Sequence, residues 1–275
     1  MCVLAFAWNA HPGWRLVMAG NRDELHDRPA APLARWGDLE PDLDHVIAGR
    51  DLQAGGTWAG ISTQGRFAVV TNLRGYGPPR AGMASRGEMV ADLLGKRGRY
   101  DDPYGLDLSA FNPFSLILAD PAQAYFLTNR PHGLGRFFRF GRPRSSPAIL
   151  TPAIYGLSNG ALDAPWPKTL QLKAALTDWL AQDADDPAAL FAALRSETLL
   201  PIGTAPDQPS DVPQEARQSP IFIRNPVYGT RCSTIVAIET SGAGQIIERL
   251  FDAAGDQTGE SAEMFRWPPL ITLRR

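Results

Sequence analysis

The strongest constraint on the fold is a pair of apolar, β-favouring runs at the start of the chain. Residues 2–8 form the first run, which begins at Cys2, and residues 14–20 form the second. The segment His11-Pro12-Gly13 between them has the composition of a turn, so we predict a β-hairpin. The second strand would lie beside Cys2 and carry Asn21-Arg22-Asp23-Glu24 at its far end.

Cys2 follows the initiator methionine, which methionine aminopeptidase can remove when the next residue is small. The mature chain would then carry a thiol and a free α-amine on one residue. Such an amine has a pKa of about 7.7–8.0 and accepts a proton near neutral pH. A nucleophile activated by its own amine is an established catalytic arrangement. The alternative is that Cys2 is an inert small residue.

The polar residues after the second run alternate between the two faces of a strand. Asn21 and Asp23 would point one way, and Arg22 and Glu24 the other. Taken as an isolated signal, so many charges at the end of a hairpin also fit a solvated turn.

The rest of the chain contains strands in groups and helices in two clusters. Ser85-Arg86-Gly87-Glu88 has the form of a capping box and precedes apolar residues at helical spacing. Further helices are predicted at 167–182 and after Asp186-Pro187, and long loops at 25–44 and 201–220. Strands are predicted at 44–51, 55–62, 66–72, 114–119, 124–128, 154–160, 231–240, 244–252 and 261–267.

This order of elements predicts an α+β fold, because it lacks the alternation of strands and helices that builds a parallel sheet. Grouped antiparallel strands with separate helices favour two sheets packed face to face with helices outside. Since composition does not change abruptly along the chain, we expect residues 1–275 to form a single domain.

Composition excludes several classes of function. The formal net charge is −2 and the chain has no basic stripe, so we expect no nucleic-acid partner. The apolar runs are shorter than the ~20 residues of a membrane span, and no signal peptide is evident. Cys2 and Cys232 are the two cysteines, too few for a disulfide framework or a metal site. We expect a cytoplasmic protein without metal or cofactor, and the oligomeric state stays open.

Several motifs together resemble the NRDE family, also called the transport and Golgi organization 2 family. They occur in the family's order and span nearly the whole chain. The motifs are Met1-Cys2, Asn21-Arg22-Asp23-Glu24 followed by Arg28-Pro29, Gly55-Gly56-Thr57-Trp58-Ala59-Gly60-Ile61-Ser62, Thr71-Asn72, Ser85-Arg86-Gly87-Glu88, Tyr155-Gly156-Leu157-Ser158-Asn159 and Tyr228-Gly229-Thr230-Arg231.

That family in turn resembles the N-terminal nucleophile hydrolases of the choloylglycine hydrolase and penicillin V acylase type. Those enzymes have an αββα sandwich and cut a linear amide with an N-terminal cysteine. The resemblance implies a nucleophile, an arginine at the end of the second strand, an oxyanion residue, a strand-end asparagine and a late supporting arginine, which are Cys2, Arg22, Asn72, Asn159 and Arg231.

One departure concerns the aspartate of the hydrolases, which follows the first arginine by three residues. This chain has Leu25 at that position, and its aspartate, Asp23, is adjacent to the arginine. Whether Asp23 reaches the amine of Cys2 is therefore left open.

The implied chemistry is attack of the Cys2 thiol on a small amide or acyl compound, with the α-amine taking the proton. Asn72 and Asn159 would donate to the oxyanion, and Arg22 and Arg231 would lower the pKa of the thiol. Asp23, the sixth candidate site residue, would orient the amine.

The alternative is a non-enzymatic protein that binds or carries haem or an acyl lipid, because eukaryotic members of the family are linked to lipid metabolism, secretory organisation and haem trafficking. The histidines support no Cys–His dyad, since none stands at a recognisable spacing from Cys2; they are His11, His26, His45 and His132. Gly55-Gly56 predicts a tight turn rather than a phosphate loop, and Cys232 is expected to be buried and inert.

Overall fold

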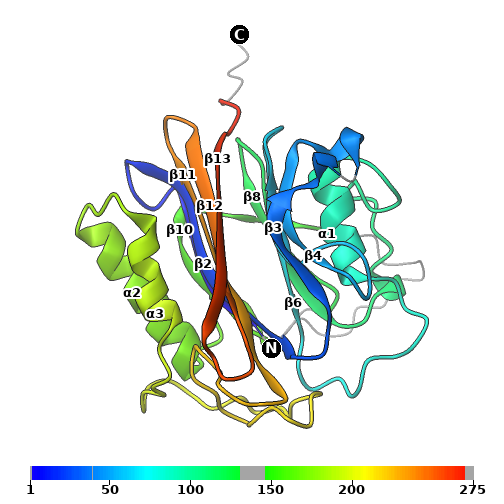
Figure 1. Cartoon of the computed structure of the whole chain (residues 1–275), viewed down its shortest axis with the longest axis vertical. Coiled ribbons are helices and arrows are strands. Elements are labelled where there is room, and N and C mark those ends of the chain that lie inside the picture. Colours follow the sequence, from blue (N-terminus) through cyan, green and yellow to red (C-terminus); the bar gives the residue numbers. More distant parts are fainter. Residues whose placement is uncertain (1, 39, 131–145, 270–275) are drawn as a thin grey trace.

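Two antiparallel sheets stack face to face, with helices on both outer sides (Figure 1). The computed structural model describes residues 2–38, 40–130 and 146–269. The strand order is β10-β1-β2-β11-β12-β13 in the first sheet and β3-β4-β5-β6-β7-β8-β9 in the second. The predicted α+β fold, an αββα sandwich, is therefore confirmed.

The first sheet consists of β1 (Cys2–Trp8), β2 (Trp14–Leu25), β10 (Ala153–Leu157), β11 (Tyr228–Glu239), β12 (Ala243–Phe251) and β13 (Gln257–Arg266). The second consists of β3 (Ala30–Arg35), β4 (Val46–Asp51), β5 (Ala59–Ser62), β6 (Arg66–Asn72), β7 (Phe114–Ala119), β8 (Ala124–Thr128) and β9 (Ala148–Leu150). The helices are α1 (Arg86–Gly95), α2 (Pro167–Ala181) and α3 (Phe191–Leu194), with single 3-10 turns at 36–38, 41–43, 108–110 and 187–190.

The side chains of β1 alternate between two hydrophobic cores and so connect the layers of the fold. Leu4 and Phe6 point into the core between the two sheets. Val3 and Ala5 point the other way, into the core under α2 and α3. Both faces of the strand are buried, so nearly every residue of β1 is apolar.

The predicted hairpin and the helix start at Ser85 are confirmed. β1 pairs with β2 from Cys2 to Trp8, and Ser85 caps α1 by accepting a hydrogen bond from the backbone N–H of Glu88. Gly56 makes the turn before β5 with a φ of +76°, and a Cβ there would lie 2.2 Å from the backbone of Gly87. The absence of a side chain at Gly56 therefore allows this turn to pack closely against the backbone at the start of α1.

The prediction of a loop over residues 25–44 is wrong in part, because β3 forms within it. β3 is an edge strand that pairs with β4 through an irregular register and contains Pro32. Within sheets, proline is confined to edge strands, first residues and bulges, and such a strand lacks the regular alternation of a central one. β9, the other edge of the same sheet, was also not predicted.

The polar end of the hairpin is not a solvated turn. β2 continues to Leu25, and Asn21, Arg22 and Asp23 are between 3% and 6% exposed. Among the described residues, no helix has the length and apolar character required to cross a bilayer.

Candidate active site

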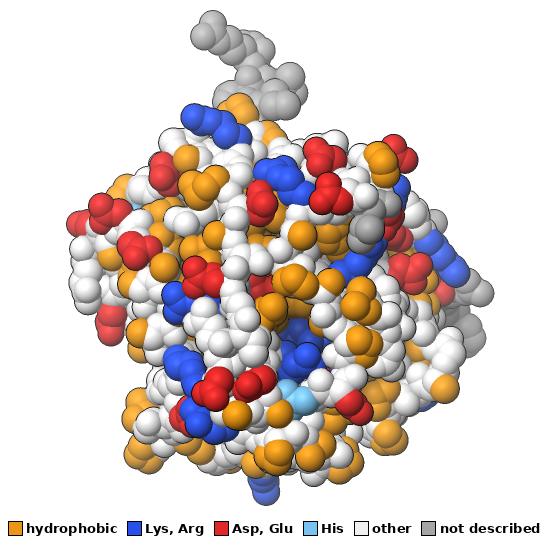
Figure 2. Space-filling view, in the orientation of Figure 1, with side chains coloured by type: hydrophobic (Ala, Val, Ile, Leu, Met, Phe, Trp, Pro, Cys, Tyr) orange, Lys and Arg blue, Asp and Glu red, His pale blue; other side chains and the backbone are white. Residues whose placement is uncertain are grey.

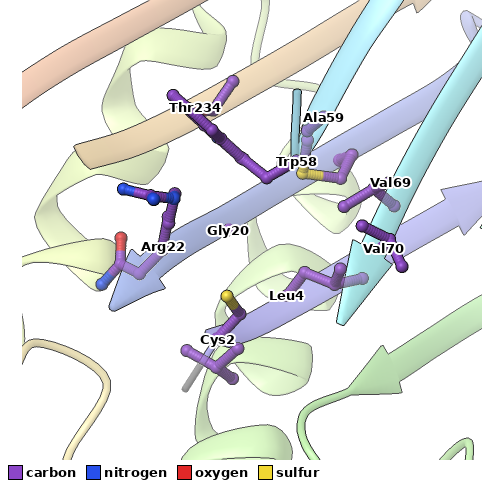
Figure 3. Close-up of a pocket in the computed structure, with 12 residues that line it drawn as sticks. Cys2, Leu4, Gly20, Arg22, Trp58, Ala59, Val69, Val70 and Thr234 are labelled. Carbon is purple, nitrogen blue, oxygen red and sulfur yellow. The ribbon is translucent and has the colours of Figure 1, made fainter. Parts of the chain in front are cut away.

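The register of the hairpin places Cys2 directly opposite Arg22. The Cys2 side chain lies on the same face of β1 as Leu4 and Phe6, so its thiol points between the two sheets. Figure 3 shows this thiol on β1 and the Arg22 side chain on β2, with Trp58 across the gap. The predicted alternation of the NRDE residues is thus present, with Arg22 facing inward.

A narrow pocket begins at the thiol. Its wall includes Gly20, Arg22 and Trp58, with Val69 from the second sheet. The volume of this open pocket is about 20 Å³, room for roughly one water molecule. Figure 2 shows basic side chains deep in a hollow of the surface, with hydrophobic side chains around it.

Asn159 and Ser158, at the turn after β10, hold the backbone of Cys2. The Cys2 nitrogen lies 3.2 Å from Asn159 Oδ1. Ser158 Oγ donates to the Cys2 carbonyl oxygen at 2.7 Å. Both side chains are at most 5% exposed. Hydrogen bonds therefore fix Cys2 on both sides of its Cα, at its nitrogen and at its carbonyl oxygen.

Asn72 takes part through its backbone. Asn159 Nδ2 donates to the Asn72 carbonyl oxygen at 2.8 Å, whereas the Asn72 side chain is exposed. The –NH₂ group of Asn159 carries a second N–H, and a bond to an oxyanion would have to come from it. The oxyanion role of the two side chains stays a prediction.

The charge of Arg22 lowers the pKa of the Cys2 thiol, as expected, but the pKa is raised overall. Burial raises the pKa of the Cys2 thiol, and the nearby Asp23 charge adds to this effect. A backbone hydrogen bond from Asp23 and the charge of Arg22 act in the opposite direction and are outweighed. At neutral pH the thiol therefore needs a base to become a nucleophile.

Arg22 is 6% exposed and stacks on Trp58, with 4.5 Å from its guanidinium carbon to the ring centroid. Glu24 and Asp51 lie 3.8 Å from its Nη2. The cation beside Cys2 is thus held by an aromatic face and two carboxylates.

Asp23 projects from the other face of β2, towards α2. Its Oδ1 accepts a hydrogen bond from Thr230 Oγ1 at 2.6 Å, across the register of β2 and β11. Burial raises the pKa of this carboxyl, while the Lys168 ammonium and the Thr230 hydroxyl lower it.

Arg231 lies at a register shift of β11, between the pairs Thr230–Asp23 and Cys232–Arg22. Its Nη1 donates to the carbonyl oxygens of Leu25 (2.7 Å) and Arg28 (3.1 Å). It therefore anchors the end of β2, and its predicted effect on the thiol stays a prediction.

Sequence reasoning missed four residues around Cys2. Lys168 and Glu215 are buried near Asp23, Arg74 pairs with Glu215 at 2.7 Å, and Cys2 is among the charges that act on Arg86. Of the four, Arg86 alone belongs to a motif that the sequence analysis recognised, so a sequence signal could have indicated it. A lysine at the start of a helix and an acid in a long loop give no such signal.

Cys232 is 1% exposed, as predicted, and burial raises its pKa well above the ordinary value. It lies beside Glu248, a buried acid of β12 whose Oε1 accepts from the backbone N–H of Leu33. Met1 and His132 lie outside the described residues. Within the described ranges, no three His, Cys, Asp or Glu side chains group as metal ligands do.

The family model for transport and Golgi organisation 2 matches residues 1–253. The transport and Golgi organization protein 2 homolog of Bos taurus is 31% identical over 269 residues, which cover 90% of this chain and 92% of that protein. The Homo sapiens homolog is 30% identical over the same shares, and the Drosophila melanogaster protein is 30% identical over 50% of this chain and 54% of its own length.

Two solved structures resemble the chain at a TM-score of 0.47. One is the Caenorhabditis elegans ortholog of N-acylethanolamine-hydrolyzing acid amidase, with 12% identity over 85% of this chain and 92% of that one. The other is a mutant conjugated bile acid hydrolase from Clostridium perfringens, with 9% identity over 97% and 96% of the two chains.

Proposed function

The chain belongs to the transport and Golgi organisation 2 family, and we propose that it is a cytoplasmic, N-terminal nucleophile hydrolase-like protein. Its substrate would be a small linear amide or acyl compound. The observation that supports this is the setting of Cys2: the nitrogen lies 3.2 Å from the Asn159 side-chain oxygen, and the thiol faces a pocket.

Removal of Met1 converts the Cys2 nitrogen from a peptide N–H into an amine, at a position where Asn159 Oδ1 already accepts a hydrogen bond. Because burial raises the pKa of the thiol, little thiolate forms unaided near neutral pH. The amine on the same residue is the base that overcomes this difficulty, and Arg22 stabilises the thiolate that results.

In the reaction, the amine takes the thiol proton and the sulfur attacks the substrate carbonyl carbon, which becomes a tetrahedral oxyanion. The oxyanion collapses to a thioester on Cys2, and the bond to the leaving group breaks as the ammonium returns the proton to it. Water then cleaves the thioester and restores the thiol. A donor such as the second N–H of Asn159 contributes about 2.7–4 kcal/mol to such a step.

The test is a covalent adduct. The full chain is released from a fusion by a protease that cuts directly before Cys2, incubated with mixed acyl amides and thioesters, and examined by intact-mass and peptide mass spectrometry. We expect an acyl group on Cys2, none in Cys2→Ser, and parent-like labelling in Cys232→Ser, which changes the buried second thiol.

Absence of adduct and product across the panel would refute the proposal. The same protein is then tested for haem and fatty-acyl binding. Equal binding by the parent and by Cys2→Ser would favour the binding or trafficking alternative.

A further inference from the structure

A cluster of buried charges lies beside the Cys2 backbone, on the side of β1 and β2 that faces α2. Its members are Asp23, Arg74, Lys168 and Glu215. Three of these residues are between 3% and 5% exposed, and the side chain of the fourth, Glu215, is 3% exposed. Two cations and two anions balance one another, as buried charges must to avoid a large desolvation cost.

The cluster is connected to Cys2 by contacts. The backbone N–H of Arg74 donates to the Asn159 carbonyl oxygen at 2.8 Å, and the Asn159 side chain holds the Cys2 nitrogen. Asp23 follows Arg22, the register partner of Cys2. Arg74 Nη2 lies 2.7 Å from Glu215 Oε1.

The buried position of Lys168 is the one in this cluster that is hardest to explain as a contribution to the stability of the fold. It is the second residue of α2, near the positive end of the helix dipole, where cations are disfavoured. It is 3% exposed, and its Nζ donates to Ser219 Oγ at 3.1 Å. Burial lowers the pKa of this ammonium, and Asp23 and Glu215 oppose that effect.

The strand next to β1 is shaped to bring this turn of α2 close. Gly156 of β10 faces Thr169, and a Cβ at Gly156 would lie 2.4 Å from Thr169 Cγ2. The glycine, which pairs with Ala5 of β1, lets the helix start approach the sheet three residues from Cys2. Lys168 is thus held near the nucleophile by packing.

A protonated α-amine on Cys2 would add a third cation to a cluster that is already balanced. Two further cations act around Cys2 from other elements, Arg22 of β2 and Arg86 of α1. The carboxylates of Glu24 and Asp51 lie beside Arg22, and the Cys2 thiol is itself titratable. We propose that Lys168 is a positioning residue whose charge keeps the Cys2 α-amine neutral and able to accept the thiol proton, an inference that rests on the proposed function.

Two substitutions shift the balance in opposite directions. Lys168→Met removes a cation, so the α-amine should hold its proton more tightly and its pKa should rise by about one unit. Glu215→Gln removes an anion, so the pKa of the amine should fall. Ser219→Ala removes the hydrogen bond that Lys168 donates to Ser219 Oγ but keeps every charge, and it should leave the pKa of the amine within a few tenths of a unit.

The experiment measures the amine directly. The full chain is released with Cys2 at its N-terminus after labelling of cysteine with ¹³C and ¹⁵N, and the Cys2 signals are titrated by NMR. Opposite shifts in Lys168→Met and Glu215→Gln support the proposal. Unchanged midpoints, shifts of the same sign, or a shift in Ser219→Ala as large as in Lys168→Met would overturn it.

If Lys168→Met does not fold, Glu215→Gln decides the matter by the sign of its shift. Acyl-adduct formation is measured on the same samples. Shifts without adduct would refute the hydrolase and leave the effect of Lys168 on the amine standing. Adduct with unchanged midpoints would refute the role of Lys168 alone.

Discussion

Replacing Asn159 with alanine should weaken the fold and the reaction together. The side chain accepts from the Cys2 nitrogen at 3.2 Å and donates to the Asn72 carbonyl oxygen at 2.8 Å. Alanine removes both bonds and leaves the half-buried carbonyl of Asn72 without this donor. At about 1 to 1.5 kcal/mol for each bond, the free energy of unfolding should fall by about 2–3 kcal/mol. This corresponds to a melting temperature lower by roughly 4–12 °C.

Asn72→Ala is the matched control. Asn159 binds the backbone carbonyl of Asn72, which alanine retains, and the Asn72 side chain is exposed. Its free energy of unfolding should stay within about 0.5 kcal/mol of the parent. Urea titration and calorimetry measure both variants. Equal losses in the two, or no loss in Asn159→Ala, would refute the assigned bridge.

The same variant separates structure from catalysis. Asn159→Ala should still allow alkylation of Cys2, because the thiol remains. Its acylation rate should fall by about 10²–10³ if the amide donates to the oxyanion. An unchanged acylation rate would exclude Asn159 as an oxyanion donor.

Three further predictions concern other buried groups. Brief iodoacetamide treatment should label Cys2, which is half-buried, before Cys232, which is buried. Because burial raises the pKa of the Cys2 thiol, labelling should become faster as the pH exceeds the ordinary pKa of a thiol. Equal labelling of the two cysteines in peptide mapping would contradict this prediction. Burial also raises the pKa of Glu248 in the folded state above its value in the unfolded state. Its contribution to stability is therefore fully present below the unfolded-state pKa and is lost as pH rises through the folded-state pKa. Denaturation at several pH values should therefore show that the stability of Glu248→Gln increases relative to that of the parent as pH rises. A difference in stability that does not change with pH would count against this prediction. Arg74→Met removes the cation that pairs with Glu215 and should lower the free energy of unfolding by about 3–5 kcal/mol, measured with urea; a loss below 1 kcal/mol would disprove the buried pair.

The strands and helix starts were predictable because their signals are local. The apolar runs at 2–8 and 14–20 and the capping box at Ser85 each specify structure within a few residues. β3 escaped prediction because an edge strand with Pro32 needs only one partner and carries no regular alternation. Its pairing with β4 depends on a segment more than ten residues further along the chain.

Of the candidate site, the neighbourhood of Cys2 and Arg22 follows from the hairpin alone, since two paired strands with a short turn bring their ends together. Asn159 lies 157 residues from Cys2, so only the family resemblance indicated it. The contribution of Asn72 through its carbonyl oxygen was beyond any sequence signal, because every residue has that group.

The sequence by itself determined the two sandwiched sheets and a cysteine at the start of β1 opposite an arginine, because period, turns and caps are properties of neighbouring residues. The tertiary structure alone decided which charges surround that cysteine. Lys168 at a helix start and Glu215 in a long loop carry no local signal of burial. They are buried near Asp23 because α2 and the loop that precedes β11 fold over the start of β1, and burial depends on segments far apart in the chain.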